Sequence, residues 1–426
     1  MDEYIKIPEQ ISAIAGKFGN ITLYVVGGYV RNSLLGFGNT DLDVCSAMMP
    51  EDVLKLFGKD AVLVNEKLGT VHIKSGDEII EHTTFRSESY PSGGFHTPEK
   101  VRIGVSLEED AFRRDFTMNA LYAEVSTGKI IDPTGRGVFD IRSRNIMTTS
   151  ADPFYIMKDD GLRILRMVRL GAQLNFYTEE SLNECVKKNI DLLDAISPER
   201  IYQEIKLILL ADMRYPFSSC GHRRAALQMK HLGLLKKLFP VYPYNSGSEA
   251  DTNILIDIFS STPPDFTLRL ASLFLMADPD EARTVLENLK VEQSRIKFIC
   301  SVISEKNFGR NGDVSDPDIR RQIQKMGTKE FEALTELRRA EDIETGRMGN
   351  WRRFMKVLHE TESFPCTSSE LAVNGKDLMQ EFGIRPSPIL GEIISGLMDF
   401  CAENPLNNKR DILLSEAKRL YTKLRK

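Results

Sequence analysis

The stretch from Tyr24 to Val44, YVVGGYVRNSLLGFGNTDLDV, constrains the possible fold more than any other part of the chain. It predicts a short apolar strand, a glycine turn, a helix over residues 29–35, a polar loop and a second strand. The second strand carries Asp41 and Asp43, and side chains two residues apart on a strand leave the same face. Two carboxylates placed in this way can hold a pair of divalent cations about 4 Å apart, an arrangement used for phosphoryl transfer.

The glycine turn, Gly27-Gly28, lies directly before the predicted helix. Backbone N–H groups at such a position, together with the Arg31 guanidinium, are suited to a polyphosphate. Taken singly, each feature has a plain structural interpretation, because most acidic strand pairs are solvated and most Gly-Gly pairs are only turns. Their order, with 14 residues from Gly27 to Asp41, predicts a combined phosphate and metal site.

Composition limits the remaining interpretations. A chain of 426 residues with net charge −5 has room for roughly two to four domains, and any nucleic-acid surface must be a local basic patch. Its six cysteines are scattered without a CxxC pair, which fits a reducing cytosol and excludes a cysteine-rich zinc module. The first residues lack a signal-peptide pattern, and no apolar run approaches the roughly 20 residues of a membrane span. We therefore expect a soluble, cytoplasmic protein with no membrane partner.

Hydrophobic periodicity divides the chain into an α/β part and an all-α part. Up to residue 150 strand and helix patterns alternate, which predicts a head with a small mixed sheet. From Pro153 onward the helical period of 3.6 persists to the end of the chain. The expected divisions are a head over residues 1–150, a helical neck over 151–215, a helical body over 216–335 and a helical tail over 336–426.

Two segments of the head lead to more specific predictions. Residues 87–105 are rich in Gly, Pro and Ser and are predicted to form one long functional loop. Residues 106–125 are predicted to form a helix, opened by a capping box of Ser106 and Glu109.

Polar residues gather in the second half of this predicted helix, at Arg113, Arg114, Asp115 and Asn119. Asp115 and Asn119 are four residues apart and would share a helical face. The arginines could bind phosphate oxygens, while the carboxylate and the amide could hold a ribose. A surface helix with a cluster of charges explains the same residues equally well.

Asp160, Arg163, Arg166 and Arg169 recur at every third position of the next helical segment and form one charged ridge. Such ridges are most often solvated helix faces. An Asp and an Arg spaced i, i+3 can also select a base. The carboxylate accepts from the exocyclic amine of C or A and meets a carbonyl in U or G. On this second interpretation the ridge accepts CTP and ATP and rejects UTP and GTP.

Glu81 lies on a predicted strand over residues 78–85 that could pair beside the two aspartates. A third metal-binding carboxylate is one interpretation of it, and an ordinary polar strand residue is the other. The sequence leaves both open.

The last predicted helix, DILLSEAKRLYTKLRK, holds the densest positive cluster of the chain. A surface for nucleic-acid phosphates and a frayed, solvated terminus are both compatible with it. The cluster consists of Lys418, Arg419, Lys423, Arg425 and Lys426.

With these residues in view, the sequence resembles the bacterial tRNA nucleotidyltransferases, or CCA-adding enzymes, which share a class with bacterial poly(A) polymerases. The resemblance covers nearly the whole chain. GGYVRN with LLGFGNTDLDV resembles the phosphate and metal motif of the family, and RRDFTMNAL resembles its ribose motif. DPTGRGVFDIRSR is similar to the head–neck connection, and DDGLRILRMVR to the nucleotide-selecting motif. SPERIYQEI resembles the helix that follows, and LAVNGKDLMQEFGI the tail signature of the Gram-positive branch.

The resemblance implies an α/β nucleotidyltransferase head followed by an all-α neck, body and tRNA-binding tail. It implies that Asp41 and Asp43 are the catalytic residues and the ligands of Mg²⁺. It also implies that the 87–105 loop is a flexible element tied to addition of the final A. The residues implied to bind nucleotide are Gly27, Gly28, Arg31, Arg114, Asp115, Asn119, Asp160, Arg163, Arg166 and Arg169.

Three residues depart from the family pattern. Asn32 stands where the family usually has Asp, so a hydrogen bond from this position could persist while its charge is lost. Asp159 replaces Glu and Gly161 replaces Pro at the start of the nucleotide-selecting motif. The shorter Asp159 would weaken a salt bridge that orients Arg163. The departure therefore bears on discrimination of C and A more than on metal catalysis.

The implied reaction is attack of a tRNA 3′-hydroxyl on the α-phosphate of CTP or ATP, without a template and with release of pyrophosphate. Two alternatives stay open. One is a poly(A) polymerase, or an enzyme that adds only A or only CC, because these share the head motifs. The other, of a different class, is a catalytically silent RNA-binding protein. Neither the oligomeric state nor a preference between magnesium and manganese follows from the sequence.

Overall fold

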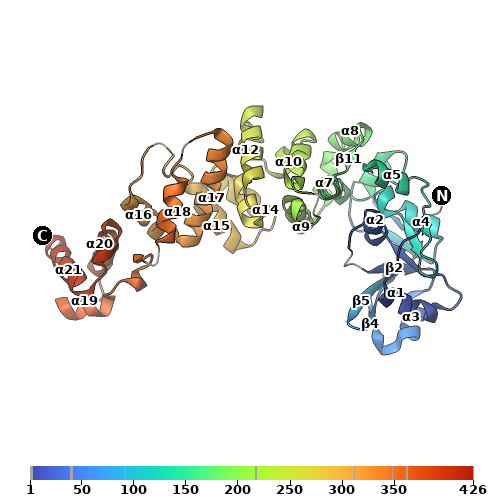
Figure 1. Ribbon diagram of the computed structural model, residues 1–426, viewed down its shortest axis with the longest axis horizontal. Helices are drawn as coiled ribbons and strands as arrows, with labels where there is room; N and C mark the ends of the chain where they lie inside the picture. The colour runs from blue at the N-terminus through green and yellow to red at the C-terminus, as the bar shows by residue number, and fades with distance from the viewer. Residues whose placement is uncertain are drawn as a thin grey trace. The chain divides into compact units, whose positions relative to one another are not determined.

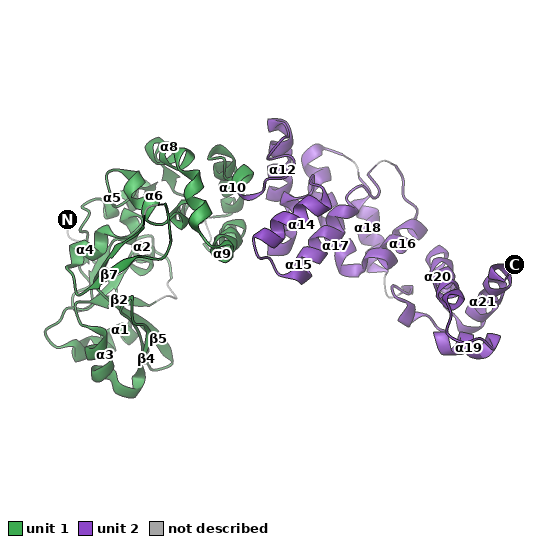
Figure 2. Cartoon of the chain, turned by 180° about the vertical axis from the view of Figure 1, so that it is seen from behind, with its two compact units in different colours: residues 1–237 green, residues 238–426 purple. Residues whose placement is uncertain are grey.

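The computed structural model describes residues 3–38, 42–91, 93–215, 218–310, 312–347, 349–360 and 363–425. The chain divides into two compact units, residues 1–237 and 238–426 (Figure 2). Among the described residues, the strands all lie in the first unit and the second unit contains only helices and their connections. The predicted α/β head with an all-α remainder is therefore confirmed. The finer expected divisions into neck, body and tail stay predictions.

A seven-stranded mixed sheet forms the centre of the first unit (Figure 1). Its strand order is β3-β4-β5-β2-β1-β8-β9, with β2 and β5 parallel and the other neighbouring strands antiparallel. Parallel neighbours need a crossover connection between them. For β2 and β5 this connection begins with the helix between β2 and β3, which carries the chain across the sheet. The strands are β1 (Tyr24–Val26), β2 (Asp43–Ser46), β3 (Ala61–Asn65), β4 (Thr70–Ser75), β5 (Glu78–Thr84), β8 (Tyr122–Glu124) and β9 (Ile130–Ile131).

Helices flank this sheet and then continue beyond it as a helical segment. The predicted short helix after the glycine turn is present as α2. A second, two-stranded pairing joins β10 (Asn145–Ile146) to β11 (Tyr177–Thr178) in parallel. The helices of the unit are α1 (Glu9–Ala15), α2 (Gly28–Leu34), α3 (Pro50–Phe57), α4 (Leu107–Phe112), α5 (Gly137–Ser143), α6 (Pro153–Asp159), α7 (Leu162–Leu174), α8 (Glu180–Lys188), α9 (Pro198–Leu209), α10 (Gly221–His231) and α11 (Leu234–Leu238, which crosses the division).

Alternation along β2 fixes the face of the sheet on which Asp43 lies. Val44 is buried opposite His82 of β5, on the face covered by α1 and α3. Cys45 points to the other face, where it packs with Phe85 and Tyr122. Because strand side chains alternate, Asp43 shares the face of Cys45 and lies exposed at the beginning of the strand.

The segment 87–105 is not the continuous loop that its composition predicts. β6 (Arg86–Ser89) and β7 (Lys100–Ile103) pair antiparallel, so that only residues 90–99 connect them. Both strands are short and polar, which removes the apolar alternation by which strands are recognised. The hairpin is instead fixed by Arg86, whose guanidinium donates to Glu88 Oε1 at 2.6 Å and to the Leu68 carbonyl at 2.9 Å.

The predicted helix over residues 106–125 is also wrong beyond its first turns. The capping box is confirmed, because Ser106 Oγ accepts from the Glu109 amide and Glu109 Oε2 accepts from the Ser106 amide, both at 3.2 Å. The helix α4 ends at Phe112, and a short 3₁₀ turn over Thr117–Asn119 leads into β8. The end of the segment instead forms β8, which pairs with β1 in the sheet. The free energy gained from this pairing outweighs the helical propensity of the segment.

The second unit consists of helices around apolar cores. Its last three helices enclose one such core, in which Leu378, Ile393, Leu397 and Leu413 are fully buried. No helix in the described part of the chain is both long and apolar enough to cross a membrane. The helices are α12 (Glu249–Ser261), α13 (Phe266–Leu273), α14 (Pro279–Asn288), α15 (Gln293–Ser304), α16 (Asp316–Met326), α17 (Thr328–Thr345), α18 (Trp351–His359), α19 (Gly375–Phe382), α20 (Pro388–Glu403) and α21 (Arg410–Leu424).

Gly137 provides a test of the packing behind the Asn119 turn. A Cβ at this position would lie 2.6 Å from the Thr117 carbonyl oxygen and 2.8 Å from Leu121 Cδ2. We expect Gly137→Ala to lower the free energy of unfolding by about 1–3 kcal/mol, measured by urea denaturation. Gly16→Ala is the matched control, because nothing lies within 4 Å of its added Cβ, and it should change stability by less than about 0.5 kcal/mol. Equal effects of the two substitutions would contradict this account of the packing.

Candidate active site

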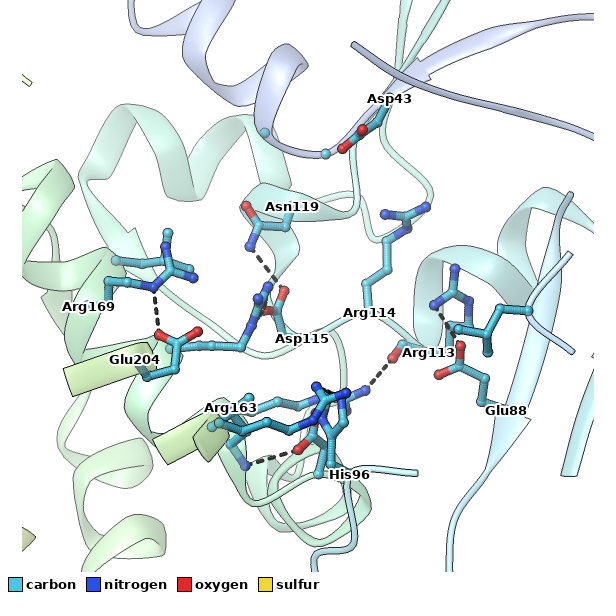
Figure 3. Close-up of a pocket in the computed structure, with 18 of the residues that line it drawn as sticks. Asp43, Glu88, His96, Arg113, Arg114, Asp115, Asn119, Arg163, Arg169 and Glu204 are labelled. Carbon is cyan, nitrogen blue, oxygen red and sulfur yellow. Dashed lines mark hydrogen bonds and ion pairs between the residues drawn. The ribbon is translucent and has the colours of Figure 1, made fainter. Parts of the chain in front are cut away.

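A cleft of about 1340 Å³ in the first unit gathers the residues that the sequence predicts to bind nucleotide (Figure 3). Eleven of the twelve predicted site residues line it, and the twelfth, Asp41, lies outside the described residues. They come from the turn after β1, the start of β2, the segment after α4, and the start and body of α7. The eleven are Gly27, Gly28, Arg31, Asp43, Arg114, Asp115, Asn119, Asp160, Arg163, Arg166 and Arg169.

The cleft has the opposite charge to the chain as a whole. Ten lysine and arginine side chains line it against six aspartates and glutamates, an excess of four positive charges. The net charge of the full sequence is −5. Clefts that are lined by one sign of charge concentrate ligands of the other sign, so this one is suited to a polyanion.

The Gly27-Gly28 turn and Arg31 form one corner of the cleft. Gly27 has φ 68°, a conformation that disfavours any residue with a Cβ, and Gly28 lies beside the Arg31 guanidinium. Arg31 donates from Nε and Nη2 to Asn32 Oδ1 at 3.1 and 2.9 Å, and from Nη1 to Asn119 Oδ1 at 2.6 Å. A hydrogen bond from position 32 is thus present although the usual carboxylate is not. Burial lowers the pKa of Arg31 from its ordinary value.

Asp43 lies at the edge of the cleft beside Glu81, its partner in the parallel pairing of β2 with β5. The predicted pairing of the Glu81 strand is therefore confirmed. Glu81 itself does not line the cleft, and its Oε2 lies 3.4 Å from His72 Nε2. Within the described ranges no cluster of three or more His, Cys, Asp or Glu side chains could hold a metal ion. A hard cation here would depend on Asp43, on Asp41, and on oxygens of a bound phosphate, a donor set that suits Mg²⁺.

Asp115 links the segment after α4 to α7. Its Oδ1 accepts from the Phe116 amide at 2.8 Å and from Asn119 Nδ2 at 3.0 Å, and Figure 3 shows the second of these bonds. Its Oδ2 accepts from Arg166 Nε at 2.8 Å and Nη2 at 2.6 Å. Burial opposes ionisation, but Arg166 and Asn119 outweigh it and hold the pKa of Asp115 below its usual range. The predicted proximity of Asp115 and Asn119 is correct, although no continuous helix produces it.

Arg114 is held by the buried carboxylate of Asp110, which lies on α4. Its Nη2 donates to Asp110 Oδ2 at 2.9 Å and its Nε to the Tyr122 hydroxyl at 3.1 Å. Burial works against the cation, but Asp110 overcomes it and raises the pKa of Arg114. Arg113 donates to Asp110 Oδ1 at 2.8 Å and to Glu88 Oε1 at 3.1 Å. The surface-helix interpretation of these arginines is therefore wrong, because both are largely buried in ion pairs.

In the charged ridge, Asp160 precedes α7 while the three arginines lie on it, and all four side chains are held in polar contacts within the cleft. The helix breaks at Asp160 and Gly161, between α6 and α7, and Asp160 has an extended backbone with φ −150° and ψ 104°. Asp160 and Arg163 are each only 6% exposed. Arg166 is bonded to Asp115, and Arg169 Nε donates to Glu204 Oε2 at 2.7 Å. The side chains of the ridge therefore point into the cleft, and the solvated-face interpretation fails.

Asp160 is bound from both sides. Its Oδ1 accepts from the Leu162 amide at 3.0 Å, and its Oδ2 lies 2.7 Å from His96 Nδ1, on the β6–β7 connection. Arg200 contacts the other ring nitrogen of His96, and a guanidinium can only donate. His96 Nε2 must therefore accept, which leaves the ring proton on Nδ1, where it is donated to Asp160.

The two departures at the start of the selecting motif have separate structural outcomes. A Cβ at Gly161 would lie 2.4 Å from the Leu192 carbonyl oxygen, and the Gly161 amide donates to the Gly94 carbonyl at 2.9 Å. Glycine at this position therefore accompanies a close approach of two backbone segments. Arg163 is oriented by the carbonyls of Ile156 and Arg113, at 3.0 and 2.8 Å. No ion pair joins it to Asp159 among the residues the structure describes.

Several polar residues of the cleft were not singled out from the sequence, among them His96, Arg200, Glu204 and Tyr215. Arg200 and Glu204 are four apart on α9 and both line the cleft, so their spacing on one helical face is the signal that could have paired them. His96 lies in a connection without periodicity. Tyr215 reaches Asn32 across 183 positions of sequence, and no local pattern predicts such a contact.

Comparison with known proteins gives matches along most of the chain. Residues 23–147 match the poly A polymerase head domain, residues 175–244 a probable RNA and SrmB-binding site of polymerase A, and residues 266–417 a putative tRNA nucleotidyltransferase domain 2. The CCA-adding enzyme of Ligilactobacillus salivarius is 30% identical over 404 residues, covering 93% of this chain and 92% of its own. That of Enterococcus faecalis is 30% identical over 410 residues, with 94% and 92% covered.

Solved structures give the same result. The Bacillus stearothermophilus CCA-adding enzyme in complex with CTP matches with a TM-score of 0.74 and 25% identity, over 98% of both chains. The Thermotoga maritima CCA-adding enzyme complexed with tRNA shares the fold, with a TM-score of 0.65 and 19% identity over 96% of this chain and 94% of that one. Identity and coverage along almost the whole sequence show that this chain belongs to the family of CCA-adding enzymes.

Proposed function

We propose that this protein adds C, C and A to the 3′ end of tRNA without a template, using CTP and ATP and releasing pyrophosphate. The observation that carries the proposal is the positive cleft in which the glycine turn, Asp43 and the arginines of α7 converge, in a chain of this family. A polyanionic nucleotide and the 3′ end of an RNA are the two ligands that such chemistry brings together.

The triphosphate is assigned to the corner formed by the glycine turn. Arg31 and Arg114 lie beside Gly28 and Gly27, and forked guanidinium donors match phosphate oxygens. Asn119 and Asp115 are assigned to the ribose, with Asp115 also orienting Arg166. The absence of a Cβ at Gly27 and Gly28 lets the phosphates approach the backbone closely.

Asp43 and Asp41 are assigned to Mg²⁺ and to catalysis. Carboxylate oxygens together with substrate phosphates are the usual ligands of this ion. When bound, a pair of such ions supplies activation of the attacking 3′-hydroxyl and compensation of the negative charge on the leaving pyrophosphate. The exposed position of Asp43 at the start of β2 leaves its carboxylate accessible from the cleft.

Selection of the base is assigned to Asp160 and Arg163. Asp160 would accept from the exocyclic amine of C or A, and Arg163 would donate to a ring nitrogen. Both carry fixed hydrogen bonds to backbone groups, which hold their side chains in defined positions. His96 occupies Asp160 Oδ2, so a base that uses this oxygen takes the place of the imidazole.

The helical second unit is assigned to tRNA, in keeping with the match of residues 266–417. Lys418, Arg419, Lys423 and Arg425 lie on or next to α21, while Lys426 is outside the described residues. Arg419 is paired with Glu416 at 2.6 Å. Lys418 and Lys423 are therefore better candidates than Arg419 for contacts with tRNA phosphates.

Sequencing the products of purified protein tests the proposal directly. Given tRNAs that end at N73, C74 or C75 with each triphosphate, we expect growth to CCA and then a stop. Poly(A) tails would indicate a poly(A) polymerase, addition of A only to C75 would indicate an A-adding enzyme, and no extension of any RNA would contradict the proposal.

Asp43→Asn keeps the shape of the side chain and removes its charge. We expect it to lower kcat for incorporation of CTP by at least about 100-fold, because a neutral amide is a poor metal ligand, while tRNA affinity stays within about twofold. Glu78→Gln, an exposed change at the start of β5, is the control and should leave kcat unchanged. Activity of Asp43→Asn near that of the control would contradict the role of Asp43.

Asp160→Asn replaces an acceptor-only carboxylate by a group that both donates and accepts. We expect UTP and GTP to gain incorporation relative to CTP and ATP by about tenfold or more, since their carbonyls would meet an N–H group. Single-nucleotide incorporation with all four triphosphates measures this ratio. The same selectivity as in the parent protein would count against Asp160 as the selecting residue.

A further inference from the structure

Arg31 differs from most of the other arginines of the cleft in the kind of acceptor that holds it. Arg113, Arg114, Arg166 and Arg169 each donate to a carboxylate. Arg31 donates to the amide oxygens of Asn32 and Asn119 and also makes a hydrogen bond with the Tyr215 side chain, and neither amide cancels its charge. It is 7% exposed, so its position is set by these neutral contacts within the protein.

The Asn32 amide has one orientation that satisfies its neighbours. Two guanidinium nitrogens of Arg31 donate to Oδ1, and the reverse orientation would place N–H groups against N–H groups. Nδ2 then faces the Tyr215 hydroxyl at 3.1 Å, and the same hydroxyl lies 3.2 Å from Oδ1. Asn32 is 5% exposed and Tyr215 9% exposed, so this contact is closed to solvent.

Tyr215 reaches this point from the far end of the helical segment that follows the sheet. It comes after α9, and its ring packs against Phe37 with centroids 5.2 Å apart. It also lines the cleft together with Arg31. Packing therefore fixes the Tyr215 hydroxyl. This hydroxyl supports the Asn32 amide, which in turn orients the Arg31 guanidinium next to the glycine turn.

We propose that Tyr215 is a positioning residue for nucleotide binding, which fixes the Asn32 amide so that Arg31 faces the triphosphate as a cation held by neutral acceptors. The inference rests on the proposed role of Arg31 at the triphosphate. An aspartate at position 32 would hold Arg31 through an ion pair and would need no further support. The need for the Tyr215 hydroxyl is thus a consequence of the asparagine in this chain.

Equilibrium binding of CTP to the full chain, by calorimetry with Mg²⁺ and without tRNA, tests the inference. Tyr215→Phe removes one hydroxyl and is expected to weaken CTP binding about threefold to tenfold, the effect of one hydrogen bond. Tyr29→Phe is the matched control on α2, because its hydroxyl donates to the Lys6 carbonyl at 3.3 Å, and CTP affinity should stay unchanged. Unchanged affinity in Tyr215→Phe would overturn the inference.

A double-mutant cycle separates positioning from a general loss of structure. Asn32→Asp supplies the ion pair to Arg31, so Tyr215→Phe in this background should change CTP affinity by less than about twofold. A purely structural role of Tyr215, or a role through its direct hydrogen bond with Arg31 alone, would give the same loss in both backgrounds and would overturn the inference. Thermal unfolding of each variant checks that the compared proteins are folded.

Arg31→Ala distinguishes failure of the inference from failure of the proposed function. We expect it to weaken CTP binding by about tenfold or more, because it removes a charge-assisted contact. If Arg31→Ala binds CTP as the parent does, the proposed triphosphate corner is wrong and the inference falls with it. If Arg31→Ala weakens binding and Tyr215→Phe does not, the triphosphate corner stands and only the role of Tyr215 is overturned.

Discussion

Compensation of buried guanidinium groups is the constraint on which the head of this protein depends. A positive cleft in an acidic chain requires several arginines to lie together out of bulk water, and like charges that close would destabilise the fold. Carboxylates from other elements resolve this conflict. Asp110 holds Arg113 and Arg114, Asp115 holds Arg166, and Glu204 holds Arg169. The acidic groups lower the repulsion and also fix each guanidinium in one place.

The sequence predicted which residues share the cleft better than it predicted the elements that carry them. Eleven predicted residues line one cleft, because the order of the motifs along the chain indicated which side chains come together. The sequence did not predict where helices end. Residues 106–125 satisfy a helical pattern, yet pairing of β8 with β1 ends α4 at Phe112, and Asp160 interrupts the helical pattern between α6 and α7. Tertiary contacts determine both helix ends, and a local sequence pattern does not predict such contacts.

Contacts between distant polar residues were beyond sequence reasoning for a related reason. His96 and Tyr215 contact Asp160 and Asn32 through hydrogen bonds, and such isolated contacts leave no periodic pattern in the sequence. Glycine residues indicated only in part where two backbone segments approach closely. The close approach of Leu192 to both Gly94 and Gly161 explains why neither position has room for a side chain, but the sequence did not indicate which backbone would lie there.

Two guanidinium groups of the cleft are held by neutral oxygens, and their positions are informative. Arg31 is bound by amide oxygens below the glycine turn, and Arg163 by the carbonyls of Ile156 and Arg113 beside Asp160. An ion-paired arginine must share its charge with its carboxylate, whereas an arginine held by dipoles presents nearly its whole charge to a ligand. These two cations lie beside the glycine turn and beside Asp160, where the proposed function puts the triphosphate and the base. Fixing these two cations with neutral groups costs burial energy, and that cost is understandable where a bound nucleotide supplies the missing compensation.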